Sequence, residues 1–271
     1  MEPEQESLSL EMNPEQLSDT VSQDVVVKKR TRKHLVVTGC IFLVFATLVI
    51  FLVFGYRIKI CGESVWGLSP NLEVYQKDVT TADIETLSKM PFLQSVTFYQ
   101  CGLHNISSNM TLSPNFSVKE LSFIQTGGGV DYILDNLPHK ESLQSLKINE
   151  SGDWISGSIK LDFRQFTGLR ELELTNTSSI NATNWAEAKQ LEVYIGTRYN
   201  FPIDYSNLLQ NCVKLKKVVL SECNVGNINF IEKLSNLEYI SLSGSYVTNV
   251  EFLKTYSKAT EIEIHTDGIW S

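Results

Sequence analysis

The stretch "LKKVVLSECNVGNI", residues 215–228, opens a repeat that continues to the last residue of the chain. Residues 237–258 and 259–271 align with it in the same register, with a period of 22 residues. The matching apolar positions are Leu215, Leu237 and Ala259; Val218, Ile240 and Ile262; Leu220, Leu242 and Ile264; and Val225, Val247 and Ile269. Self-similarity at a fixed period indicates an array of like structural units.

The core of this repeat, apolar-x-x-apolar-x-apolar, also occurs upstream. Its copies are "SPNLEV" (69–74), "LQSVTF" (93–98), "VKELSF" (118–123), "LQSLKI" (143–148), "LRELEL" (169–174) and the weaker "AKQLEV" (188–193). The last core positions are Val74, Phe98, Phe123, Ile148, Leu174, Val193, Leu220, Leu242 and Ile264. Their spacings are 24, 25, 25, 26, 19, 27, 22 and 22 residues, so nine units fill nearly all of residues 68–271.

The pattern resembles that of the leucine-rich-repeat family, "LxxLxLxxNxL", and the last three units resemble the 22-residue internalin-type repeat. The resemblance implies an α/β fold, a right-handed solenoid with a concave parallel sheet. Each unit is expected to supply one strand to that sheet and a turn or short helix to the convex back. The segment "TTADIETLSKM" (80–90) predicts such a helix, with Thr80 and Asp83 at its cap and Ile84 and Leu87 facing inward.

Two cysteines, Cys101 and Cys223, follow the last core position of their units by three residues, at the asparagine-or-cysteine position of the family pattern. The chain turns there, and a small side chain that hydrogen-bonds inward would satisfy buried backbone groups. We therefore expect both cysteines to be structural. Five strand spacings, about 24 Å, would separate them, which is too far for a disulfide.

The N-terminal part differs from the repeats. Residues 1–34 hold seven acids and then the basic run "KKRTRK" (28–33), and they predict a disordered tail. Residues 35–56 contain no charge and, as a helix, would span about 33 Å, roughly one bilayer core. The basic bias before this segment predicts a single-pass anchor in the cell membrane with a cytoplasmic N-terminus. Residues 57–71 are then a linker and N-terminal cap, and residues 72–271 are the extracellular repeat domain.

The sequence offers no catalytic, cofactor or metal-binding motif. A net charge of −8 also disfavours nucleic acid as a partner. Function is therefore expected on the concave face, where tyrosines and acids predominate and where tyrosine supplies contact area at a low entropic cost. The candidate ligand-binding residues are Tyr99, Glu171, Glu173, Glu192, Tyr194, Tyr239, Glu261 and Glu263.

These features predict a membrane-anchored, non-catalytic module that binds a protein ligand outside the cell. Two alternatives remain open at this point. The repeats could serve as a structural or adhesion element that provides reach, or the protein could be a signalling receptor whose acidic tail contacts an intracellular partner. Deleting residues 1–27 would have an effect in the receptor, whereas an adhesin would bind along the whole face.

Overall fold

The computed structural model describes residues 36–51, 55–150, 159–176, 180–197, 205–250, 253, 256 and 261–264. Contacts divide the chain into two units, Met1–Tyr56 and Arg57–Ser271. In the first unit, residues 36–50 are α-helical and their side chains are exposed. The helices found within the described residues all fall short of the length and apolar character needed to cross a bilayer. The predicted anchor, residues 35–56, includes residues 35 and 52–54, which lie outside the described part.

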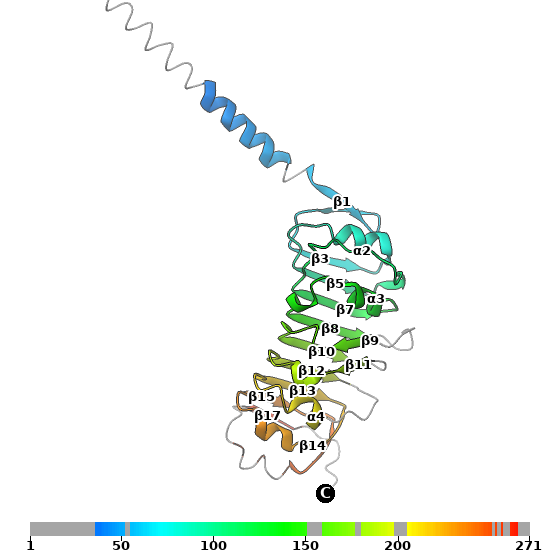
Figure 1. Cartoon of the computed structure of the whole chain (residues 1–271), viewed down its shortest axis with the longest axis vertical. Coiled ribbons are helices and arrows are strands. Elements are labelled where there is room, and N and C mark those ends of the chain that lie inside the picture. The colour runs from blue at the N-terminus through cyan, green and yellow to red at the C-terminus, as the bar shows by residue number, and fades with distance from the viewer. Residues whose placement is uncertain are drawn as a thin grey trace, which may run out of the picture. The chain divides into compact units, whose positions relative to one another are not determined.

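The second unit is built around one parallel sheet of nine strands, which are stacked in chain order (Figure 1). The strands are β3 (Asn71–Tyr75), β5 (Ser95–Tyr99), β7 (Glu120–Thr126), β8 (Ser145–Glu150), β10 (Glu171–Thr175), β12 (Val193–Thr197), β13 (Lys217–Ser221), β15 (Tyr239–Ser241) and β17 (Glu261–Glu263). Each of the nine predicted units supplies one of them. The prediction of a repeat solenoid with a long parallel sheet is therefore confirmed.

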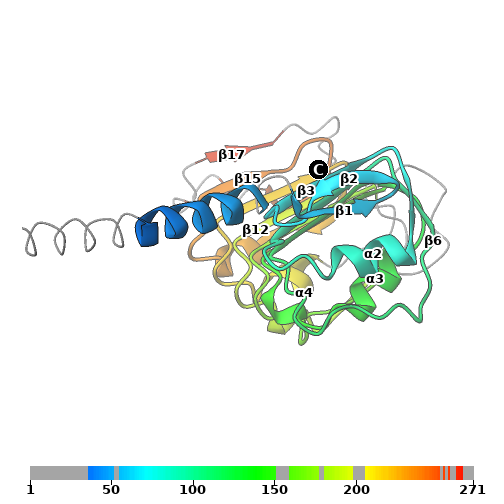
Figure 2. The same ribbon diagram turned by 90° about the horizontal axis from the view of Figure 1, so that it is seen from above.

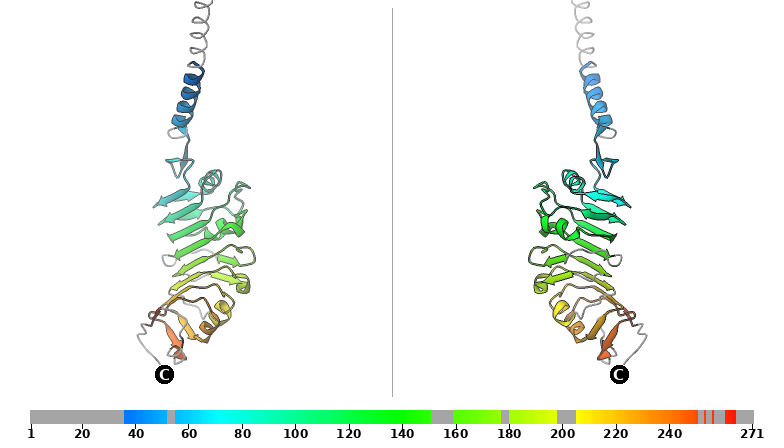
Figure 3. Two further views of the ribbon diagram at one scale, coloured as in Figure 1. Left: turned by 90° about the vertical axis from the view of Figure 1, so that its left-hand side faces the viewer. Right: turned by 90° about the vertical axis from the view of Figure 1, so that its right-hand side faces the viewer.

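The return path of each coil carries shorter elements. Three pairs of strands form small parallel sheets: β4 (Asp78–Thr80) with β6 (Gly102–Asn105), β9 (Ile159–Asp162) with β11 (Ile180–Thr183), and β14 (Asn224–Asn227) with β16 (Tyr246–Thr248). The helices are α2 (Thr81–Leu87), α3 (Val130–Asn136) and α4 (Tyr205–Leu209), with 3₁₀ turns η2 (Lys140–Ser142), η3 (Trp185–Glu187) and η4 (Asn229–Lys233). Figure 2 shows the three α-helices on the side of the coil opposite the main sheet, and Figure 3 shows the successive coils from both sides.

The N-terminal cap and the first back helix follow local sequence signals. An antiparallel hairpin, β1 (Arg57–Ile60) and β2 (Glu63–Trp66), precedes the first repeat. Helix α2 begins with a capping box in which the Thr80 hydroxyl accepts from the Asp83 N–H and the Asp83 carboxylate accepts from the Thr80 N–H. Its inward residues Ile84 and Leu87 are buried. The helix predicted within residues 80–90 is therefore confirmed, together with its cap.

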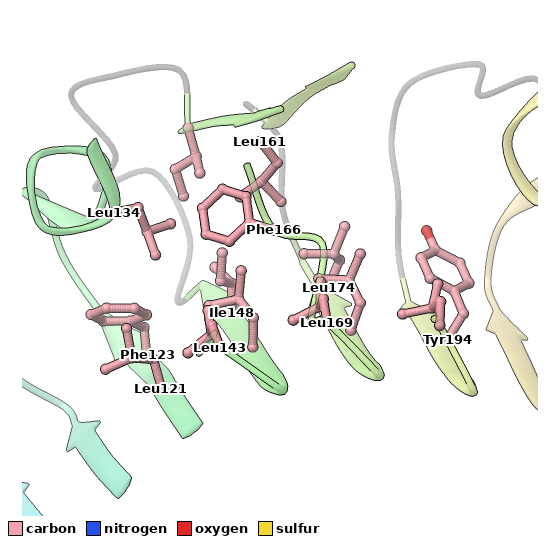
Figure 4. Close-up of a cluster of buried hydrophobic side chains, with 14 of the residues drawn as sticks. Leu121, Phe123, Leu134, Leu143, Ile148, Leu161, Phe166, Leu169, Leu174 and Tyr194 are labelled. Atoms are coloured by element: carbon pink, nitrogen blue, oxygen red, sulfur yellow. The ribbon is translucent and has the colours of Figure 1, made fainter. Parts of the chain in front are cut away.

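Alternate residues of the main strands point into the coil and form one continuous core. Figure 4 shows Leu121, Phe123, Ile148 and Leu174 directed to the same side of their strands, and all four are buried. Phe123 stacks on Phe98 of the preceding unit, with ring centroids 5.5 Å apart. Each unit therefore completes its neighbour's core, as expected when a coil cannot bury its apolar face alone.

The sixth unit corrects the predicted register. Leu172 pairs with Tyr194 and Leu174 pairs with Gly196, so the core positions of β12 are Tyr194 and Gly196, and Val193 faces outward. Tyr194 is fully buried. A Cβ atom added to Gly196 would lie 3.3 Å from the Tyr194 ring and hydroxyl. One large residue thus occupies the space that two aliphatic residues fill in the neighbouring units.

Cys101 and Cys223 have the inward role that we expected, and Ser245 shares it. The Cys101 Sγ donates to the Val74 carbonyl at 3.2 Å, and the Cys223 Sγ donates to the Gly196 carbonyl at 3.4 Å. Ser245 makes the corresponding bond to the Leu220 carbonyl at 2.9 Å. In each case the acceptor is the last core residue of the preceding unit, one residue before its strand ends. All five cysteines have free thiols in this structure.

Candidate binding face

We call the surface made by the outward side chains of the nine-stranded sheet the outer face. It corresponds to the concave face of the sequence prediction. Strand pairing aligns its residues in columns, because parallel neighbours keep the same register across the sheet. Adjacent strands lie about 4.8 Å apart, so side chains in one column interact directly. Interactions within the columns change in kind from one end of the sheet to the other.

At the β3 end, the outer face is aromatic and mostly neutral. Tyr75 pairs in register with Tyr99, and Tyr99 with Ile124 of β7. The ring centroids of the two tyrosines are 5.4 Å apart, and Tyr75 is 53% exposed. The Tyr75 hydroxyl donates to the Glu73 carboxylate at 2.9 Å, and this bond raises the pKa of Tyr75. The predicted site residue Tyr99 therefore lies on the face, next to a more exposed tyrosine.

In the middle of the sheet the outer face is charged. The Lys147 ammonium on β8 lies 3.2 Å from the Glu171 carboxylate and 3.8 Å from the Glu173 carboxylate, both on β10. Glu171 also accepts from the Ser145 hydroxyl at 2.8 Å. Both predicted acids are therefore on the face, where they share a single cation and leave an excess of negative charge.

Glu192 lies at the edge of the sheet, immediately before β12. Its carboxylate is 2.7 Å from the Lys216 ammonium and 3.5 Å from the Arg170 guanidinium. The hydrogen bond from Lys216, together with its charge, lowers the pKa of Glu192. The prediction that Glu192 projects from a strand is corrected. Glu192 precedes β12 and contacts Arg170, which precedes β10, and Lys216, which precedes β13, so it connects three successive units along one edge of the sheet.

Tyr194 is absent from the face because it is buried in the core. The sequence prediction took Val193 as a core position, and that shift of register exchanged the two sides of β12. Val193 and Ile195 face outward in its place, and Ile195 pairs in register with Val219 of β13. The three side chains are partly exposed. An aliphatic patch thus occupies the position predicted for a tyrosine.

At the β17 end, a tyrosine and acids form one cluster. The Tyr239 hydroxyl donates to the Glu263 carboxylate at 2.6 Å, which raises the pKa of Tyr239. The Lys217 ammonium lies 5.3 Å from the centroid of the Tyr239 ring, within range of a cation–π interaction. Glu261 pairs in register with Tyr239 and is exposed. The structure brings these three predicted residues, Tyr239, Glu261 and Glu263, together on adjacent strands.

A further row of polar residues was missed by the sequence prediction. Gln76, Gln100 and Gln125 follow the last core positions of the first three units by two residues, and all are exposed. The Gln76 amide donates to the Gln100 side-chain oxygen at 2.7 Å, and the Gln100 amide donates to that of Gln125 at 2.8 Å. The recurring tripeptides "VYQ" (74–76), "FYQ" (98–100) and "FIQ" (123–125) were the signal that could have identified this row.

The glutamines share an unusual backbone conformation. Their φ angles are 50°, 53° and 53°, and Asn176 and Glu222 occupy the same position of their units at 54°. This left-handed conformation turns the chain, while the N–H of Gln76 still bonds the Tyr99 carbonyl of the next unit at 2.9 Å. The geometry directs each side chain toward its counterpart one coil further on.

Metal ligation and thiol reactivity can be judged for the described part of the chain. Within them, no three histidine, cysteine or acidic side chains are grouped so as to hold a metal ion. Burial raises the pKa of Cys212 to about 12, and burial followed by the Asp83 charge raises the pKa of Cys61 to about 11. A thiol with such a pKa is almost fully protonated at neutral pH and is a poor nucleophile.

Comparison with solved structures agrees with this architecture. The chain is similar to an internalin C2 from Listeria monocytogenes, with a TM-score of 0.54 and 17% identity over 75% of this chain and 85% of that chain. The chain has a leucine-rich-repeat fold. An internalin F from the same organism is also 17% identical, with a TM-score of 0.48 over 75% of this chain and 64% of that chain. At such identity the likeness concerns the fold alone. No family model matches the chain, and no curated protein matches its sequence.

Proposed function

We propose that the protein is a membrane-anchored, non-catalytic leucine-rich-repeat module that binds a protein ligand outside the cell. The observation that carries this proposal is the nine-stranded outer face, whose C-terminal end groups Tyr239, Glu261 and Glu263 on adjacent strands. An aromatic ring beside carboxylates supplies both contact area and charge for a partner. With Lys217 as the nearby cation, acids outnumber bases at this end. A basic partner segment therefore fits best.

The membrane part of the proposal rests on the uncharged run of residues 35–56 and on the basic residues that precede it. Side chains of residues 36–50, including Ile41, Phe42 and Phe45, are exposed, as suits contact with lipid. Protease added to intact cells should remove an epitope placed after Ser271 and spare one placed before Met1. The reverse pattern would overturn the proposed orientation, and protection of both epitopes would exclude an extracellular repeat domain.

Binding can be tested with the full-length protein in detergent. A partner would first be recovered by chemical crosslinking on cells and identified by mass spectrometry, and its affinity then measured by surface plasmon resonance. The double variant Glu261→Lys/Glu263→Lys should weaken binding at least about tenfold, because it replaces two attractive charges with repulsive ones.

A matched control carries the same change in charge away from the outer face. The variant Asp135→Lys/Glu232→Lys alters exposed acids on α3 and η4 and should bind like the wild type. Equal weakening by both double variants would show an effect of net charge alone. If the Glu261/Glu263 variant binds the partner as tightly as the wild type, ligand binding at this end of the face is excluded.

A further inference from the structure

The glutamine ladder, Gln76, Gln100 and Gln125, is a second candidate site on the same sheet. Its amides are exposed but already ordered, since each is hydrogen-bonded to the next across one strand spacing of about 4.8 Å. A side-chain amide has two N–H donors and an oxygen with two lone pairs. The ladder uses one donor each from Gln76 and Gln100. Further donors and acceptors are therefore available at regular intervals, and little side-chain entropy is lost when a ligand uses them.

The aromatic pair Tyr75 and Tyr99 runs beside this ladder, because each tyrosine immediately precedes a glutamine. Their rings are 5.4 Å apart and tilted by 44°, with Tyr75 more than half exposed. The Tyr75 hydroxyl is held by Glu73, which fixes the ring in place. Two amphipathic rings with a parallel row of amides thus extend across three units of the solenoid.

The charges near these residues are few and partly paired: beside Gln76, the Lys77 ammonium lies 2.7 Å from the Glu63 carboxylate, and Glu120 is exposed at the start of β7. Outward positions of β3, β5 and β7 carry mostly hydroxyl, amide and aromatic groups, including Thr97 and Ser122 between the tyrosine column and the strand starts. The nearest acid, Glu73, accepts the hydrogen bond from Tyr75. On β8 and β10, by contrast, Lys147 forms ion pairs with Glu171 and Glu173. A ligand at the β3 end would therefore gain from hydroxyl groups and apolar surface, and little from charge.

We infer that the Tyr75–Tyr99 pair and the glutamine ladder form a binding site for a linear, uncharged polysaccharide. A sugar ring offers an apolar C–H face to an aromatic ring and hydroxyl groups, both donors and acceptors, to an amide. A chain made of one repeated sugar presents the same groups at regular intervals, as the ladder does. The ligand would lie across β3, β5 and β7, parallel to the solenoid axis. This site is separate from the proposed protein site around Tyr239.

The probes are linear hexasaccharides of β-1,4-linked glucose, mannose, xylose and N-acetylglucosamine. Binding to the full-length protein in detergent is measured by isothermal titration calorimetry. At least one hexasaccharide should bind with a Kd of about 1 mM or tighter. Tyr75→Ala should weaken that binding at least tenfold because it removes the more exposed ring.

The second test variant is Gln100→Asn, which shortens the central amide and breaks both bonds of the ladder. Asparagine tolerates the left-handed backbone at this position, so the fold should be kept and circular dichroism should be unchanged. Binding of the hexasaccharide should again fall at least tenfold. Matched controls are Gln144→Asn, before β8, and Tyr132→Ala, on α3; both residues are exposed and away from the site. Both controls should bind like the wild type.

The inference is overturned if none of the four hexasaccharides binds, or if Gln100→Asn binds as tightly as the wild type. Equal losses in the controls would overturn it as well. So would loss of a protein partner in Tyr75→Ala and Gln100→Asn without any saccharide binding, because the tyrosine pair and the glutamine ladder would then be a protein site. The Glu261→Lys/Glu263→Lys variant should keep saccharide binding, so failure of the proposed protein site is distinguishable from failure of this one.

Discussion

The two ends of the outer face share a backbone and differ in their side-chain chemistry. At the β3 end, columns are joined by amide–amide hydrogen bonds and by the Tyr75–Tyr99 contact. At the β17 end, Lys217 lies over Tyr239, and Tyr239 donates to Glu263. Both ends use the same parallel pairing. The repeat therefore fixes where a side chain stands, and the residue type alone decides what that part of the sheet can bind.

The same contrast continues inside the coil. Towards the N-terminal end, Phe98 and Phe123 occupy the third core position of their units and stack face to face. In the sixth unit, the aromatic residue is Tyr194 at the second position, and Gly196 occupies the third. Two ways of filling a coil with one aromatic ring are thus found in a single solenoid, and they can be compared by mutation.

The largest expected effect comes from breaking the second arrangement. Tyr194→Val leaves a cavity beside Gly196 and should lower the free energy of unfolding by about 3 kcal/mol. The double variant Tyr194→Val/Gly196→Leu restores the Val218–Leu220 pattern of the next unit and should recover part of that loss. Urea unfolding followed by circular dichroism measures both. A double variant less stable than Tyr194→Val would contradict the interpretation that the Tyr194 ring fills the space beside Gly196.

A smaller loss of stability is expected when the hydrogen bond from Cys101 or Ser245 to the preceding unit is removed. The loss should be similar at the N-terminal and C-terminal ends of the solenoid. Cys101→Ala and Ser245→Ala each leave a buried carbonyl without its side-chain donor, Val74 in one case and Leu220 in the other. Each should cost about 1–2 kcal/mol. Cys101→Ser keeps a donor and should cost less. Urea unfolding of the three variants tests this. If Cys101→Ala is as stable as the wild type, the Cys101–Val74 hydrogen bond does not contribute to stability.

The smallest effect concerns the pH dependence of the ion pair between Glu192 and Lys216. The pKa of Glu192 is lowered because Lys216 hydrogen-bonds and attracts the carboxylate. Stability from this pair is therefore present above the unfolded-state pKa of glutamate and is lost as pH falls through the lower, folded-state value. In Lys216→Met, the pKa of Glu192 should rise toward its ordinary value, as followed by ¹³C NMR titration.

Lys189→Met is the control for that titration, because the Lys189 ammonium contacts Glu187 at 3.0 Å. The pKa of Glu192 should stay lowered in this variant. If the pKa of Glu192 is the same in Lys216→Met as in the wild type, the ion pair between Lys216 and Glu192 does not form in solution. The glutamine ladder has no titrating group, so its hydrogen bonds should persist over the same pH range.

Sequence periodicity was sufficient to predict the solenoid, its nine strands and the cap of α2, because these depend on apolar spacing and local hydrogen bonds. It failed at β12, where the core residues are tyrosine and glycine and the aliphatic residues point outward. The irregular spacings of 19 and 27 residues were the sign of that error: with Gly196 as the last core position they become 22 and 24. The hydrogen bond between Gln76 and Gln100 could not be derived from the sequence, because it depends on the left-handed backbone of both residues.

The inward bonds of Cys101, Cys223 and Ser245 have a consequence for how the solenoid comes apart. Each of these residues belongs to one unit and satisfies a carbonyl of the unit before it. Removing a unit therefore leaves a buried acceptor exposed in the unit that remains. Such dependence between neighbours makes partial loss of the array unfavourable. Unfolding should consequently be cooperative across several coils. Most of the unfavourable free energy of a partly unfolded state should arise at the boundary between folded and unfolded units.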